Sequence, residues 1–181
     1  MIRKRKAGQN AALPSQEELL ADFAQRLKGH RKGRRAVHLH LSRLSRDHLH
    51  AHDLRRAVDA FSSLLRKYEG RLFRLANHDI VFAGKDLSFA ALDEAVLRVR
   101  GIFRDDPLYR ILDSRPRQPN GSDDFCTFYD IEREMDAFIA LSERALHALP
   151  DDRAPDSSII PFAGAPVKPL PPKPARPALA D

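Results

Sequence analysis

The sequence predicts one α+β domain in which strands and helices follow one another in the order βαββαβ, with a further helix before and after this core. Two observations lead to this fold class. Apolar residues recur at every second position in some segments and every three or four positions in others, as in strands and amphipathic helices. Residues 71–86 read as two short strands joined by a polar turn, and the helical segments on either side need a sheet to cover.

The first expected element is a helix over residues 16–28. Ser15 with Glu18 forms a capping-box pattern at its start, and Gly29 supplies a stop. A basic connector, residues 29–35, follows this helix.

A strand is expected over residues 35–44, where two kinds of side chain alternate. One face carries Val37, Leu39 and Leu41, and the other carries His38, His40 and Ser42. The two histidines either line a pocket or lie half-buried under a covering helix, and the second outcome is the more common for this residue type.

The middle of the chain predicts a helix, a hairpin and a second helix. Helical periodicity begins at Asp53 and closes at Gly70. In the hairpin, residues 80–83 form an unbroken apolar run, as expected for a strand buried on both faces, and Asn77 suits a positive φ at the turn. Residues 88–104 form the second helix.

The last part of the domain adds one strand and one helix. Residues 105–124 hold three prolines and an Asn-Gly pair, which predicts a long connection with one short turn of helix. A strand over residues 125–131 and a helix over residues 132–149 complete the order. A βαββαβ core with two helices on one face of an antiparallel sheet is the ferredoxin-like plan.

Both ends of the chain differ in composition from this domain, which we place at residues 15–149. Residues 1–14 are expected to be a disordered, basic N-terminus, and residues 150–181, with nine prolines, a disordered tail or a linker between domains. The proline spacing also suits a ligand of a proline-recognising domain, but a spacer is the commoner use of such composition. A further signalling domain after residue 181 would fit the linker interpretation.

The positive charge is concentrated near the N-terminus. Residues 1–35 hold ten Lys or Arg against three acidic residues, a balance of +7, whereas the whole chain carries +6. The single cysteine, Cys126, excludes an internal disulfide, and no apolar run is long enough to span a bilayer. We therefore expect a cytoplasmic protein without a membrane span.

The succession of strand HLHLSRL, helix, hairpin RLFRLANHDIVFAG, helix, strand FCTFYD and helix SERALHAL resembles the GGDEF domain of bacterial diguanylate cyclases. The resemblance covers residues 35–149 and implies a nucleotide-cyclase-like fold. The signature turn of that family would fall on residues 75–81, and within it on Asn77, His78 and Asp79.

This turn departs from the family signature. Asn77 and His78 replace the two glycines that let the backbone approach the nucleotide, and Ile80 replaces the glutamate. Asp79 alone remains of the acidic pair that, by the resemblance, serves metal binding and catalysis. The turn is thus expected to be a vestigial signature that offers an interaction surface.

The other functional positions of the family are also changed. Its metal-binding aspartates would fall near Leu41, Ser42 and Arg43, none of which offers a carboxylate to Mg²⁺. Its inhibitory product site, an RxxD motif, would fall on residues 68–71, which read Tyr-Glu-Gly-Arg. Because phosphoryl transfer depends on metal ions, we expect no cyclase activity, no catalytic residues and no cofactor.

A histidine-rich segment is the densest set of metal-ligand residue types in the chain. His48 and His52 would share one face of a helix, with Asp53 beside them. A solvated helix start, in which Asp47 caps the first turn, is the favoured interpretation because nothing completes a ligand set. Cys126 carries no pattern of a nucleophile.

Two functions fit these features. The first is a non-catalytic GGDEF-like module that regulates, dimerises or scaffolds, linked to cyclic-di-GMP signalling and contacting a protein partner or a second copy of itself. The second is a nucleic-acid-binding domain, although the open face of its first strand would present His38 and His40 where RNA-recognition sheets present aromatic rings. Its candidate phosphate contacts are Arg3, Lys4, Arg5, Lys6, Arg31, Lys32, Arg34 and Arg35.

Overall fold

A computed structural model of the chain describes residues 13–113, 118 and 120–148. The basic residues 1–12 and the proline-rich segment from residue 149 onward lie outside the described residues, and so do the interpretations placed on them.

Four strands form one antiparallel sheet in the order β2-β3-β1-β4. Their bounds are β1 Arg34–Leu39, β2 Gly70–Arg74, β3 Ile80–Lys85 and β4 Cys126–Asp130. The central strand β1 pairs with β3 on one side and β4 on the other, so that His38 stands opposite Val81 and Thr127. The mixed α+β class and the predicted hairpin are confirmed.

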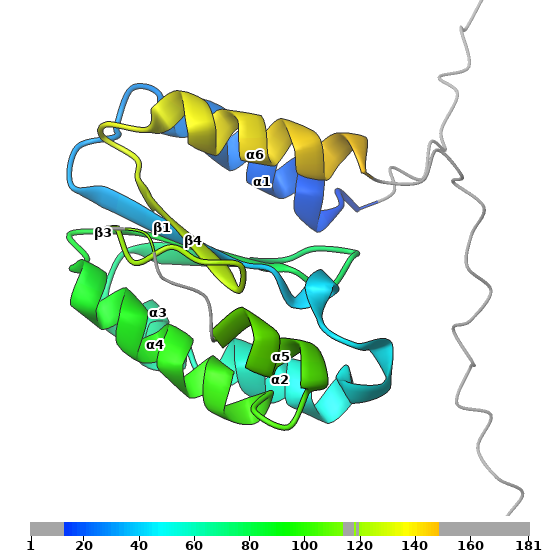
Figure 1. Ribbon diagram of the computed structural model, residues 1–181. Coiled ribbons are helices and arrows are strands. Elements are labelled where there is room, and N and C mark those ends of the chain that lie inside the picture. Colours follow the sequence, from blue (N-terminus) through cyan, green and yellow to red (C-terminus); the bar gives the residue numbers. More distant parts are fainter. Residues whose placement is uncertain (1–12, 114–117, 119, 149–181) are drawn as a thin grey trace, which may run out of the picture. The chain divides into compact units, whose positions relative to one another are not determined.

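Helices cover both faces of this sheet. Figure 1 shows α1 and α6 side by side above it and α2, α3, α4 and α5 below it. Their bounds are α1 Gln16–Leu27, α2 Ala51–Asp59, α3 Ser62–Lys67, α4 Phe89–Ile102, α5 Pro107–Asp113 and α6 Met135–His147. The open face bearing His38 and His40, which the nucleic-acid-binding alternative assumed, is therefore wrong, because α1 and α6 lie over it. The favoured interpretation placed both histidines under a covering helix, and the structure agrees with it.

The alternation of side chains along β1 explains the two layers. Val37 and Leu39 belong to the core between the sheet and helices α2, α3 and α4. Ala36 belongs to the core between the sheet and helices α1 and α6. β3 is buried on both faces over residues 80–84, as its unbroken apolar sequence predicted. Each face thus has its own hydrophobic core.

The start of α1 is fixed by side chains. Ser15 Oγ accepts the backbone N–H of Glu18 at 3.1 Å, and the Glu18 carboxylate accepts that of Ser15 at 2.7 Å, which confirms the predicted capping box. The neighbouring Glu17 is buried, and its carboxylate accepts the backbone N–H of Ala76 at 2.6 Å. This bond joins the hairpin turn to the first helix.

Three elements differ from their predicted bounds. β1 ends at Leu39 because His40 leaves the extended region and a 3-10 helix, η1 (Leu41–Arg43), follows it. The helix expected up to Gly70 is interrupted after α2, and the fully buried ring of Phe61 at this break stacks on Phe82 with centroids 5.3 Å apart. The connection over residues 105–124 contains α5, which is longer than the single turn expected.

None of the helices described in the structure has the length and apolar character needed to cross a bilayer.

Replacing Phe138 by Ala tests the packing of α6. Phe138 is fully buried and meets the Tyr129 ring edge-to-face at 5.9 Å. We expect the free energy of unfolding, measured with guanidinium chloride, to fall by about 3–5 kcal/mol because a large cavity opens in the core. Leu97→Ala is the control, since Leu97 is 50% exposed and should change stability by less than about 0.5 kcal/mol. Similar small effects of both substitutions would contradict the packing of α6.

Candidate functional site

A cavity of about 920 Å³ opens where β1 ends, between the hairpin turn, β4 and the C-terminal half of α6. Its walls are mostly polar. They include His38, His40, Ser42, Arg43, Asn77, Asp79, Gln118, Asp123, Asp124, Thr127, Tyr129 and Arg144. Residues from four separate parts of the chain therefore meet around one space.

The hairpin turn brings Asp79 to this cavity. Leu75 and Asp79 are joined by the backbone bond from Leu75 N to Asp79 O, and His78 N donates to Leu75 O. Within the turn, Asn77 Oδ1 accepts the backbone N–H of Asp79 at 3.0 Å, as in an Asx turn. The positive φ predicted at Asn77 falls instead on His78, at 75°, because the Asn77 side chain is used to bridge the turn.

Asp79 is 4% exposed and its carboxylate is held by three donors. Oδ1 accepts the backbone N–H of Ser42 at 2.8 Å, while Oδ2 lies 3.0 Å from both His38 Nε2 and Asn77 Nδ2. Burial acts to raise the pKa of Asp79, but the hydrogen bonds from His38 and Ser42 outweigh it and place the pKa below its ordinary value. The carboxylate is therefore ionised at neutral pH.

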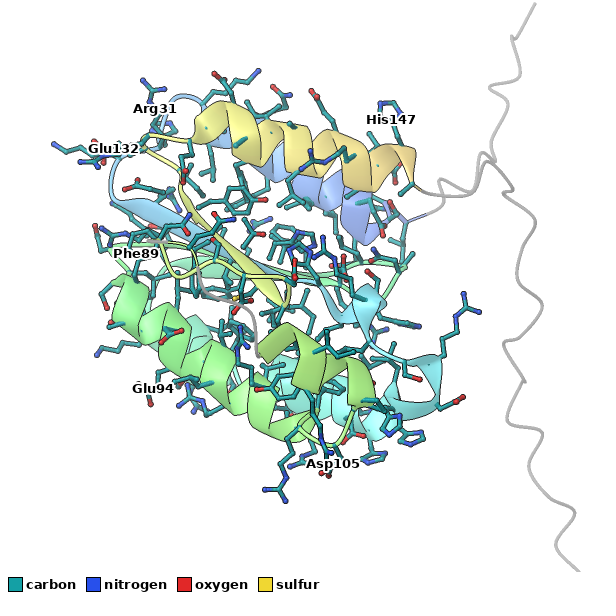
Figure 2. The ribbon with its side chains drawn as sticks, viewed as in Figure 1. Arg31, Phe89, Glu94, Asp105, Glu132 and His147 are labelled. Atoms are coloured by element: carbon teal, nitrogen blue, oxygen red, sulfur yellow. The ribbon has the colours of Figure 1, made fainter. Side chains whose placement is uncertain are left out.

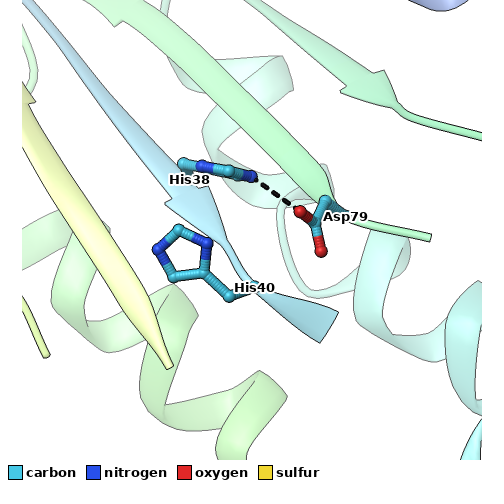
Figure 3. Close-up of side chains that lie close together, drawn as sticks. All are labelled: His38, His40 and Asp79. Atoms are coloured by element: carbon cyan, nitrogen blue, oxygen red, sulfur yellow. Dashed lines mark hydrogen bonds and ion pairs between the residues drawn. The ribbon is translucent and has the colours of Figure 1, made fainter. Parts of the chain in front are cut away.

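His38 lies in β1 and His40 directly follows the last residue of this strand, and Figure 3 shows both rings next to Asp79. Their ring centroids are 4.2 Å apart. His40 Nε2 lies 2.8 Å from Thr127 Oγ1, and the residue is only partly buried at the cavity wall. Burial, followed by the nearby His38 and Arg43, lowers the pKa of His40 to about 4, so its imidazole is neutral at pH 7.

These three side chains form a compact set of ligand atoms. One atom from each of His38, His40 and Asp79 lies within 4.8 Å of the other two, and no second group of three or more His, Cys, Asp or Glu meets this condition in the described part of the chain. Here the neutral imidazole of His40 and the imidazole of His38, which is hydrogen-bonded to Asp79, lie beside a carboxylate. Such a group can bind a metal ion, hold a proton or orient a polar ligand.

The predicted turn residues separate in the structure. Asp79 is buried in the cavity wall, whereas Asn77 and His78 are exposed at the tip of the hairpin. Asn77 and His78 also line a smaller hollow of about 420 Å³ together with Ser42 and Arg46. The turn thus has a buried structural part and an exposed part.

The weaker metal candidate, His48 with His52 and Asp53, is not assembled. His48 belongs to a short 3-10 helix, η2 (Arg46–His48), and not to α2, so the helical spacing to His52 is lost. His48 Nδ1 lies 3.9 Å from Asp106, while His52 Nε2 lies 3.2 Å from Asp53.

The basic residues of the connector gather at another place. Lys28, Arg31, Lys32, Arg34 and Lys85 line a hollow of about 710 Å³ that also includes Asp86 and Glu132. Arg31 and Glu132 lie at the end of the domain opposite His147, the last residue of α6 (Figure 2).

Two of the predicted phosphate contacts in this connector already have partners. Arg34 forms an ion pair with Glu69 at 2.7 Å. Arg35 Nη1 donates to the backbone carbonyl of Leu87, and its guanidinium stacks over Phe89. Both side chains thus help to hold the sheet and its neighbouring segments together.

Cys126 is buried, and burial with the nearby Asp123 raises the pKa of its thiol to about 12. Its neighbours are the buried ion pair of Arg100 with Asp123 and the ring of Phe125 beneath the guanidinium. A protonated, buried thiol is a poor nucleophile, so the structure gives Cys126 a packing role.

The sequence did not reveal that His38, His40 and Asp79 meet. The alternation along residues 35–44 placed both histidines on one face, but Asp79 is 41 residues from His38. The pairing of Leu39 with Ile80 brings the end of β1 beside the turn, and this register cannot be read from either strand alone.

No protein-family model, curated protein or solved structure matches this chain.

Protonation of His40 should make the protein sensitive to acid. Its pKa is about 4 in the folded chain against 6.5 for an unperturbed histidine, so the unfolded chain binds the proton more strongly. The contribution of neutral His40 to the free energy of unfolding is fully present above pH 6.5. It is lost as the pH falls toward 4, by at most about 3 kcal/mol. The groups facing His40 are His38, Arg43, Asp79 and Asp123.

Urea unfolding at pH 7 and pH 4.5 measures this effect. His40→Gln should lose less stability between the two pH values than the wild type, because Gln does not titrate. His147→Gln is the control at an exposed histidine and should behave as the wild type. Equal acid sensitivity of the wild type and His40→Gln would show that His40 is not the source.

Proposed function

We propose that this domain is a non-catalytic, GGDEF-like module with a ferredoxin-like core that regulates, dimerises or scaffolds. The support for the core is the chain order β1, α2 with α3, β2, β3, α4 and β4, together with the sheet order β2-β3-β1-β4. On this assignment, α1 and α6 are additions that cover the second face of the sheet.

The observation that carries the proposal is the bonding of Asp79. Its carboxylate is buried and accepts hydrogen bonds from His38, Ser42 and Asn77. A cyclase-type reaction uses carboxylates to hold Mg²⁺ against the phosphates. Here Asp79 fixes the turn to the end of β1, and the side chains next to it are imidazoles, which Mg²⁺ binds poorly.

The exposed tip of the hairpin is the surface through which we propose that the module contacts a protein partner or a second copy of itself. Ala76, Asn77 and His78 are exposed there, while the backbone behind them is held by Glu17 and Asp79. A rigid, exposed turn loses little conformational entropy on binding. The link to cyclic-di-GMP signalling, and to a further signalling domain, rests on the family resemblance.

Nucleic-acid binding is the second candidate, favoured by the basic hollow around Lys28, Arg31 and Lys32. Contacts of this kind to phosphates release counterions and weaken steeply with salt. Strong, salt-dependent binding of a single-stranded RNA, lost in an Arg31→Glu, Lys32→Glu variant, would favour this function over the regulatory module.

Calorimetric titration with GTP and with cyclic-di-GMP tests the regulatory proposal. We expect no binding of either nucleotide at micromolar concentration with Mg²⁺ present, because the Asp79 carboxylate at the turn is already held by His38, Ser42 and Asn77. An Asn77→Gly, His78→Gly variant is the matched comparison, because it restores the two glycines of the signature and leaves the fully buried Ile80 unchanged. Micromolar binding by the wild-type chain would contradict the proposal.

A further inference from the structure

The cavity contains an arrangement that a regulatory role of the hairpin does not require. His38, His40 and Asp79 place three ligand atoms within 4.8 Å of one another at a polar cavity wall. Two imidazoles with one carboxylate are typical ligands of zinc and other late first-row ions. We propose that these three side chains bind one divalent transition-metal ion, with zinc as the best match.

The distances are close to those of a metal site. Zinc binds imidazole nitrogen and carboxylate oxygen at about 2.0–2.2 Å, which places neighbouring tetrahedral ligands about 3.3 Å apart. His38 Nε2 and Asp79 Oδ2 are already 3.0 Å apart. A metal ion would lie between these two atoms, and the Nε2 proton that now makes their hydrogen bond would move to Nδ1 of His38 or to solvent.

His40 is the ligand that has to approach. Its Nε2 faces Thr127 Oγ1, which leaves Nδ1 for the metal. From a spacing within 4.8 Å, the ring needs to move by up to about 1.5 Å to reach tetrahedral spacing. Because His40 is only partly buried and borders the cavity, such a movement does not require the core to repack.

The surrounding hydrogen bonds fit ligands that are held in place. Metal-bound histidines generally donate their second ring nitrogen to an oxygen, as His40 can to Thr127. The Asp79 carboxylate is oriented by the Ser42 backbone N–H and by Asn77 Nδ2. Arg43, a cation close enough to lower the pKa of His40, is paired with Asp124, which reduces its repulsion of a metal ion.

The fourth coordination position would face the cavity. A volume of about 920 Å³ has room for water or for a small polar ligand on the metal. Metal binding would also tie β1 to the hairpin turn, so an occupied site should stabilise the fold by mass action.

The histidine-rich segment provides a matched control within the same chain. His48 and His52 are more exposed than the cavity histidines, and their ligand atoms are not gathered with a third residue. A His48→Gln, His52→Gln variant therefore removes two imidazoles without touching the proposed site.

Zinc titration of the full chain, without a polyhistidine tag, tests the proposal by calorimetry. We expect one ion per chain, and we expect His40→Gln to weaken binding by at least about 100-fold, since loss of a ligand should exceed the 10–100-fold cost of losing an outer partner. Thr127→Val, which removes such an outer partner, should weaken binding by about tenfold. The His48→Gln, His52→Gln variant should bind zinc as the wild type does.

Cobalt(II) gives a second readout, because its visible absorption reports nitrogen and oxygen ligands in tetrahedral geometry. Unchanged zinc affinity in His40→Gln, or loss of binding in the His48→Gln, His52→Gln variant alone, would overturn the proposal. If His40→Gln does not fold, as judged by circular dichroism, then Thr127→Val decides, and unchanged affinity there overturns it. Nucleotide binding is measured separately, so metal binding and the regulatory proposal fail independently.

Discussion

The buried carboxylate of Asp79 is the constraint on which this end of the domain depends. A buried charge is costly unless hydrogen bonds compensate it, and Asp79 has three donors from three different segments. The bond from Ser42 N accounts for the end of β1 at Leu39, because the chain turns into η1 to present this N–H. The bond from His38 places an imidazole between the first strand and the hairpin. Removing the carboxylate would leave these three donors without their common acceptor.

Individual helices and strands could be predicted from the sequence wherever one pattern governs one element. The capping box at Ser15, the apolar run from Ile80 and the helical repeats predicted α1, β3 and α4 because local side-chain periodicity decides which face is buried. The interruption near Phe61 is not predicted, since the apolar repeat continues through it and the packing of Phe61 on Phe82 depends on the tertiary structure.

The site was harder to predict, and the reason is physical. His38 and His40 stood out as polar residues on a strand, and Asp79 stood out as a remnant of an acidic signature, but the link between them is the register of β1 with β3. Register is set jointly by turn geometry and by the burial of both faces of the sheet, so it is difficult to predict from a single sequence. The role of Asn77 was misjudged for a related reason. Its side chain closes the turn, and His78 takes the left-handed conformation in its place.

One arrangement serves both the regulatory and the metal-binding proposal. As a hydrogen-bonded set, His38 and Asp79 fix a rigid turn whose exposed tip can meet a partner. As a metal site, the same side chains would bind an ion in place of their hydrogen bond, and His40 would move toward them. A bound ion and a bound partner would then be coupled through the hairpin, because both act on the segment between β2 and β3.

The coupling energy between His38 and Asp79 tests this account most directly. A double-mutant cycle with His38→Leu and Asp79→Asn, followed by urea unfolding at pH 7 with a metal chelator present, isolates the interaction from other effects of each substitution. We expect a coupling energy of at least about 1 kcal/mol, within the range of about 0.5–3 kcal/mol seen for residues of one hydrogen-bonded network. Additive effects within about 0.3 kcal/mol would show that the pair does not hold the turn to the first strand.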